Sequence, residues 1–116
     1  AETFAVLDHP DYADLFGPGS RAEAPVAGVI GATAISGRID RLVVGPDTVK
    51  ILDFKTNRPP PIQPGDVSPV YLRQMAAYRA LLSKIYENQT IECVLLWTDG
   101  PRLMPLDANL LDAYAP

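Results

Sequence analysis

Residues 37–57 read GRIDRLVVGPDTVKILDFKTN, and this stretch decides the fold of the chain. Two runs rich in β-branched and aliphatic residues, 33–44 and 49–54, lie on either side of a Gly-Pro-Asp turn at 45–47. Because so short a turn joins antiparallel neighbours, the stretch predicts a β-hairpin. Another strand is expected just before it, at residues 21–30. The first half of the chain therefore predicts three consecutive strands.

A proline-rich loop at residues 57–69 separates these strands from a long helix. The loop contains five prolines, and proline disrupts both helices and strand ladders. The helix is expected to begin near Ser68, a suitable N-cap with proline at the first helical position, and to end near Tyr86. Its apolar stripe carries Tyr71, Met75, Tyr78, Leu82 and Ile85. The remaining expected elements are a buried strand at 91–97, an edge strand at 102–106, a closing helical turn at 108–114 and a helical lead-in at 1–19.

This order of elements predicts an α/β domain with a mixed sheet. A helix that connects the third and fourth strands makes those two strands parallel, whereas the short turns make the first three antiparallel. A chain of 116 residues can build one domain around a single core. We therefore treat residues 1–116 as one domain.

The composition excludes several classes of site. A single cysteine, Cys93, leaves no internal disulfide and no cysteine-built zinc or iron–sulfur centre, and its apolar neighbours indicate a buried thiol. No signal peptide or membrane-length apolar stretch is present, so a cytoplasmic location is expected, with no membrane partner. The net charge of −4 argues against a free-standing nucleic-acid binder. No phosphate-binding Gly-x-x-x-x-Gly-Lys loop for ATP is present.

Two carboxylates lie on strand faces that should be apolar. Alternation places Asp40 on the same side of its strand as Leu42, and Asp53 on the same side as Ile51. An ionised carboxylate among aliphatic side chains is costly unless a cation or hydrogen bonds compensate for the lost hydration. Two such groups on neighbouring strands predict a divalent cation between them, and hard oxygen ligands suit Mg²⁺ or Mn²⁺.

Three further polar residues lie where they could join such a site. Lys55 projects from the same face as Asp53, where it could contact a phosphate or orient a water, or simply form a salt bridge with Asp53 or Asp40. On the helix, Gln74 and Tyr78 are one turn apart and face the same way. Gln74 interrupts an apolar stripe, so it is either a satisfied core residue or a side chain that points at a site above the sheet.

These motifs, in this order, resemble the PD-(D/E)XK nuclease superfamily, and specifically its RecB-like branch. The resemblance rests on GRIDRL at 37–42, ILDFKTN at 51–57 and YLRQMAAY at 71–78. It implies a restriction-endonuclease-like α/β fold: a mixed sheet of three strands, a long helix, then one or two further strands, with flanking helices. It also implies a Mg²⁺-dependent deoxyribonuclease, with Mn²⁺ as a substitute.

The resemblance assigns roles to the strand motifs. Asp40 and Asp53 would hold the metal, together with the peptide carbonyl of Phe54. Lys55 would be catalytic, alongside the two aspartates. A position that is often acidic in this family falls on Glu23, which would bind the metal or support its ligands from behind.

The resemblance also makes predictions for the helix and for the N-terminal part of the chain. Gln74 and Tyr78 would lie beside the DNA channel. RecB-like nucleases usually carry a metal-binding histidine before the first strand, whereas His9 is followed by Pro10 in what looks like a solvated loop. We therefore expect that histidine to precede Ala1 in a longer protein, and the present chain alone to bind metal weakly or to be inactive.

A finer resemblance links residues 95–103, LLWTDGPRL, to the C-terminal nuclease domain of AddA-type helicase–nucleases of the alphaproteobacterial kind. It implies an exonuclease that acts on single-stranded DNA from an unwound duplex during double-strand break resection. The helicase motor, in the rest of the chain, would consume ATP, and an AddB-type subunit would be the partner. The single cysteine excludes the AddB subunit itself, whose nuclease carries a four-cysteine iron–sulfur cluster.

Three other interpretations are open. The domain could be a catalytically silent nuclease-like module for docking or DNA binding, which the intact set of Asp40, Asp53 and Lys55 disfavours. It could be the core of another RecB-like exonuclease, stand-alone or from a phage. A purely structural α/β domain would leave both aspartates unexplained.

Overall fold

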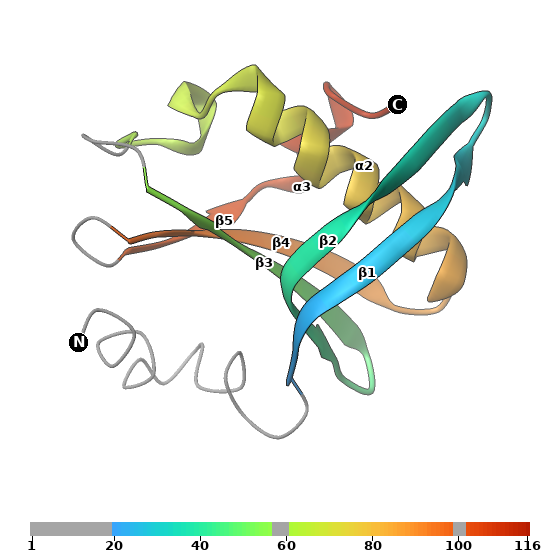
Figure 1. The fold of residues 1–116 in the computed structure, drawn as a ribbon. Coiled ribbons are helices and arrows are strands. Elements are labelled where there is room, and N and C mark those ends of the chain that lie inside the picture. The colour runs from blue at the N-terminus through green and yellow to red at the C-terminus, as the bar shows by residue number, and fades with distance from the viewer. Residues whose placement is uncertain (1–19, 57–60, 99–101) are drawn as a thin grey trace.

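The sheet is mixed and has five strands in the order β1-β2-β3-β4-β5 (Figure 1). The computed structural model describes residues 20–56, 61–98 and 102–116. Pairing is antiparallel from β1 to β2, from β2 to β3 and from β4 to β5, and parallel from β3 to β4. The expected restriction-endonuclease-like fold class is confirmed. The lead-in expected at residues 1–19 lies outside the described residues.

The elements agree closely with the ranges expected from the sequence. The strands are β1 Ser20–Ile30, β2 Thr33–Val44, β3 Thr48–Lys55, β4 Thr90–Trp97 and β5 Arg102–Leu106, and the helical elements are η2 Pro64–Asp66, α2 Pro69–Ile85 and α3 Ala108–Asp112. None of the helices in the described ranges is long and apolar enough to cross a membrane.

Two local expectations were wrong. A 3₁₀ turn, η2, forms inside the loop at 57–69 that we expected to be irregular. Its first residue is Pro64, whose fixed φ suits the first position of a helical turn. Ile85, expected in the apolar stripe of α2, is 60% exposed at the last position of the helix.

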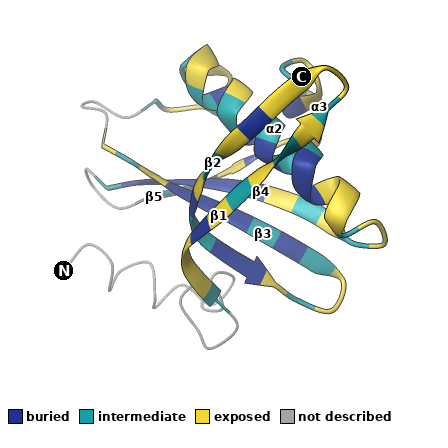
Figure 2. Cartoon of the chain, turned by 45° about the vertical axis from the view of Figure 1, so that its right-hand side comes forward, coloured by how far each residue is buried: buried dark blue, intermediate teal, exposed yellow. Residues whose placement is uncertain are grey.

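The main core lies between α2 and one face of the sheet. Figure 2 shows the buried positions gathered along this contact and along the central strands. Residues 93–97 of β4 are all buried, since β4 carries side chains into a cluster on each face. The continuous apolar run in the sequence is therefore a central strand covered on both sides, as expected.

A bend in the β1–β2 hairpin creates the feature on which the site is built. Ile39 and Leu42 both pack in the core beneath α2, so the alternation of β2 changes phase between them, at Asp40. Opposite Asp40 on β1, Glu23 has a φ of 51°, a left-handed conformation that is rare outside glycine. The hairpin leaves the plane of the sheet here and rises past α2 (Figure 1).

The pairing of β2 with β3 ends at this bend. The last paired residues are Arg41 and Leu52, whereas β3 remains paired with β4 as far as Lys55. The two strands therefore separate as a fork just beyond Leu52. Asp40 and Asp53 are the next residue on each branch.

Replacing Leu95 with alanine should lower the free energy of unfolding by about 2–5 kcal/mol, because this fully buried side chain fills the core beneath α2. Guanidinium denaturation followed by the fluorescence of Trp97, the one tryptophan, measures the change. The control is Val70→Ala on the exposed side of α2, which should change stability by about 0.5 kcal/mol or less. Equal losses in both variants would contradict this description of the core.

Candidate active site

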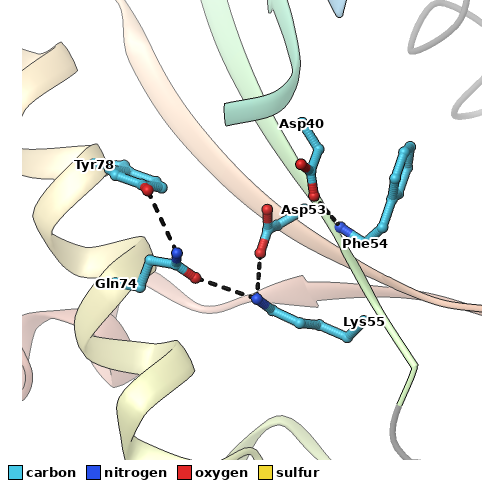
Figure 3. Close-up of polar contacts among 6 residues, drawn as sticks. All are labelled: Asp40, Asp53, Phe54, Lys55, Gln74 and Tyr78. Atoms are coloured by element: carbon cyan, nitrogen blue, oxygen red, sulfur yellow. Dashed lines mark hydrogen bonds and ion pairs between the residues drawn. The ribbon is translucent and has the colours of Figure 1, made fainter. Parts of the chain in front are cut away.

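The side chain of Asp40 takes over a hydrogen bond that the main chain of β2 no longer makes. Its Oδ2 accepts a hydrogen bond of 2.8 Å from the main-chain N–H of Phe54, in place of a main-chain carbonyl of β2 (Figure 3). In a strand the N–H and C=O of one residue point the same way, so the Phe54 carbonyl also leaves β3 on the side of Asp40. The fork thus brings a carboxylate and a main-chain carbonyl to the same side of β3.

Asp53 lies on the face of β3 that is covered by α2. It is 5% exposed, although its strand neighbours on this face are aliphatic. Its carboxylate forms an ion pair with Lys55. The carboxyl group of Asp40 is near enough to raise its pKa, so the two aspartates predicted to share a site are neighbours at the fork.

Lys55 is held by three groups from two elements. Its Nζ lies 2.5 Å from Asp53 Oδ2, donates a hydrogen bond of 3.2 Å to Gln74 Oε1, and lies 4.1 Å from the centroid of the Tyr71 ring. The side chain is only 12% exposed. Of the two salt bridges considered for Lys55, the one with Asp53 forms.

The helix supports Lys55 through a short polar chain. Gln74 points at the site rather than into the core, and its Nε2 lies 3.4 Å from the hydroxyl of Tyr78, which accepts the hydrogen bond (Figure 3). Tyr78 is buried, and its hydroxyl lies against Gly37 of β2, where a Cβ atom would collide with it. Gly37 thus allows the hairpin to pack against the helix that holds Lys55.

The pKa of Asp53 is raised from its ordinary value of 3.8 to about 6. Burial is the main cause, and the carboxylate of Asp40, which accepts a hydrogen bond from the protonated form of Asp53, adds to it, while the ammonium group of Lys55 opposes the shift. The negative charge of this carboxylate is therefore only partly compensated by the side chains around it.

These groups fit a divalent cation. They provide hard oxygen donors in the form of two neighbouring carboxylates and a main-chain carbonyl, and a cation would compensate the buried negative charge of Asp53. Among the described residues, no cluster of three or more His, Cys, Asp or Glu side chains gathers here. His9 lies outside the described residues.

The role predicted for Glu23 is not tested by the structure, whereas the structure shows a contact of Tyr71 that the sequence did not predict. Glu23 lies exposed on β1, opposite Asp40, and its role in metal binding stays a prediction. The contact of Tyr71 with Lys55 was missed, since Tyr71 read only as part of the apolar stripe of the helix. Its signal was the spacing, because residue 71 is three positions before Gln74 and shares its face.

A family model supports the same interpretation of the site. The model of the PD-(D/E)XK nuclease superfamily matches residues 7–106. This chain belongs to that superfamily. The match spans the fork and all of α2, so both carboxylates and the lysine of this PD-(D/E)XK domain lie inside it. Members of the superfamily usually use divalent metal ions, in agreement with the oxygen donors of the site.

Solved structures share the fold of this PD-(D/E)XK domain. The crystal structure of SSO0001 matches with a TM-score of 0.50 at 16% sequence identity. The match covers 95% of this chain and 51% of that one, so the chain spans about half the length of the solved protein it resembles. At this identity the likeness concerns the fold alone. No curated protein matches the chain.

In metal-free protein, Asp53→Asn should become progressively more favourable for stability as the pH rises. The pKa of Asp53 is higher in the folded state, so between 3.8 and about 6 the folded state binds more protons, and the free energy of unfolding falls with increasing pH. Asparagine does not ionise, so the variant lacks this pH-dependent loss of stability. Thermal melts of wild type and variant from pH 4 to pH 7 with a chelator measure the difference in stability, and Asp112→Asn, which loses an exposed ion pair to Arg79, is the control. A penalty for Asp53→Asn that does not change with pH would contradict this account.

Gly37→Ala should destabilise the protein because its Cβ would collide with the hydroxyl of Tyr78 and lie about 3.0 Å from Cζ. The cost should be smaller in a Tyr78→Phe background, with a coupling free energy of about 0.5–3 kcal/mol. A double-mutant cycle by chemical denaturation measures this coupling. Additive effects would mean that Gly37 is not required by Tyr78.

Proposed function

We propose that this chain is the nuclease domain of a Mg²⁺-dependent deoxyribonuclease that hydrolyses phosphodiester bonds. The observation that carries the proposal is the fork itself, where Asp40 and Asp53 are neighbours and Lys55 is paired with Asp53 and held by Gln74 of α2. Superfamily membership supports nuclease activity in general.

The residues of the chain divide the work. Asp40, Asp53 and the carbonyl of Phe54 would hold Mg²⁺, or Mn²⁺ in its place, and the bound ion would polarise a phosphoryl oxygen and acidify a water molecule. Lys55 carries a positive charge into a site that is shielded from solvent, where it can stabilise the charge that develops on the phosphate or orient the attacking water. The catalytic set is therefore Asp40, Asp53 and Lys55.

The helix completes the site on the substrate side. Gln74 is half-buried and bonded to Lys55, which puts its amide at the edge of the site, beside the path proposed for DNA. Tyr78 is buried and acts through Gln74. Glu23, exposed opposite Asp40, is proposed to support the metal ligands.

The substrate and the assembly follow from the finer resemblance. We propose that the domain is the C-terminal nuclease of an AddA-type helicase–nuclease, which degrades single-stranded DNA delivered by an ATP-driven motor during double-strand break repair, with an AddB-type partner in the cytoplasm. The segment at 95–103 supports this proposal. So does the net charge of −4, because a domain without a basic excess depends on other domains to deliver DNA.

The test is metal binding together with cleavage. In a version of the protein extended upstream of Ala1, calorimetric titration with Mn²⁺ and Mg²⁺ should show one site that is lost in Asp53→Ala, and cleavage of labelled single-stranded DNA should fall at least about a hundredfold in Asp53→Ala and in Lys55→Ala. Lys50→Ala, on the same strand but on the opposite face, should retain both properties.

The two readouts separate the alternatives. If metal binding and cleavage both survive Asp53→Ala, the active site does not lie at the fork. Metal binding without cleavage, also in a version extended upstream of Ala1, would favour the catalytically silent docking module.

A further inference from the structure

Lys55 and a metal ion make competing demands on Asp53. The ammonium group is paired with Oδ2 of this carboxylate, and that oxygen belongs to the group proposed to bind the cation. A divalent ion on Asp53 would weaken the attraction between Asp53 and Lys55, because the ion neutralises the same negative charge. The position of Lys55 then depends on the contacts that the ion does not disturb.

Both of those contacts come from the N-terminal half of α2. They are the Oε1 atom of Gln74 and the ring of Tyr71, whose centroid lies 4.1 Å from Nζ. That distance is well within the range of about 6 Å for a cation–π interaction, and the low exposure of Lys55 strengthens such a contact. The Tyr71 ring also packs against the main core, which limits its movement.

We propose that Tyr71 is a positioning residue: its ring face binds the Lys55 ammonium and orients it toward the reacting phosphate. The proposal rests on the proposed function and adds to it the means by which the lysine is placed. Both the ring and the Gln74 amide are neutral, so they attract the ammonium without cancelling its charge. The positive charge of Lys55 therefore remains able to attract a phosphate, whereas a second carboxylate in place of the ring would neutralise that charge and repel the substrate.

The contact with Lys55 requires the ring face and not the phenol hydroxyl. Tyr71→Phe should therefore preserve the cation–π contact, and Tyr71→Leu should remove this contact while keeping a large apolar side chain packed on the core. Tyr86→Leu is the matched control, because Tyr86 follows the other end of α2 and also packs partly buried against the core. A loss common to both leucine variants would report packing and not positioning.

The first measurement is NMR on protein labelled at lysine, which needs neither metal nor DNA. The chain has three lysines, so Lys50 and Lys84 serve as internal references for Lys55. Protons next to Nζ that lie over an aromatic ring are shifted upfield. We expect an upfield-shifted Lys55 signal in the wild type, in Tyr71→Phe and in Tyr86→Leu, and its loss in Tyr71→Leu. An unchanged Lys55 signal in Tyr71→Leu would overturn the proposal.

The second measurement is steady-state cleavage of single-stranded DNA with Mg²⁺. Tyr71→Leu should lower kcat about tenfold with little change in KM, and Tyr71→Phe should remain within about twofold of the wild type. A rise in KM alone would place Tyr71 against the DNA and overturn the positioning role. If neither the wild type nor any variant cleaves DNA, even in the version extended upstream of Ala1, the proposed function fails, while the NMR comparison still decides whether the ring holds Lys55.

Discussion

The site depends on one hydrogen bond, from the main-chain N–H of Phe54 to the carboxylate of Asp40. Where β2 bends away, the N–H of Phe54 no longer has a strand partner on that side, and nearly all backbone N–H groups in folded proteins are hydrogen bonded. A side chain of β2 provides the acceptor that its backbone no longer does. The fork is thus stabilised by a residue that also belongs to the site, and Asp53 on the other branch is held beside it.

From the fork, polar contacts run in one direction through the structure. Asp53 is paired with Lys55, Lys55 with Gln74, and Gln74 with Tyr78, so sheet and helix are joined by a continuous chain of hydrogen bonds and one ion pair (Figure 3). At the far end, Gly37 gives the Tyr78 hydroxyl its space. Movement of the hairpin relative to α2 would therefore disturb the lysine through Tyr78 and Gln74.

The same arrangement has an electrostatic cost. Burial and the neighbouring carboxyl raise the pKa of Asp53, so its ionised form destabilises the metal-free fold above about pH 6. Strained or uncompensated groups of this kind tend to occur at functional sites. The left-handed φ of Glu23, opposite Asp40, is a second local cost at the same bend. Both costs lie where the strands separate, and the aliphatic core beneath α2 offsets them.

The sequence by itself determined the order of the elements, the mixed sheet and the two carboxylates, because periodicity, turn residues and polar residues on apolar faces are local signals. Alternation alone did not show the change of phase at Asp40, where Ile39 and Leu42 both face the core. Only the tertiary structure decided where β2 leaves β3 and which groups then surround Lys55. The Tyr71 ring and the Phe54 N–H take part through contacts between distant segments, and such contacts depend on how the hairpin, sheet and helix pack together.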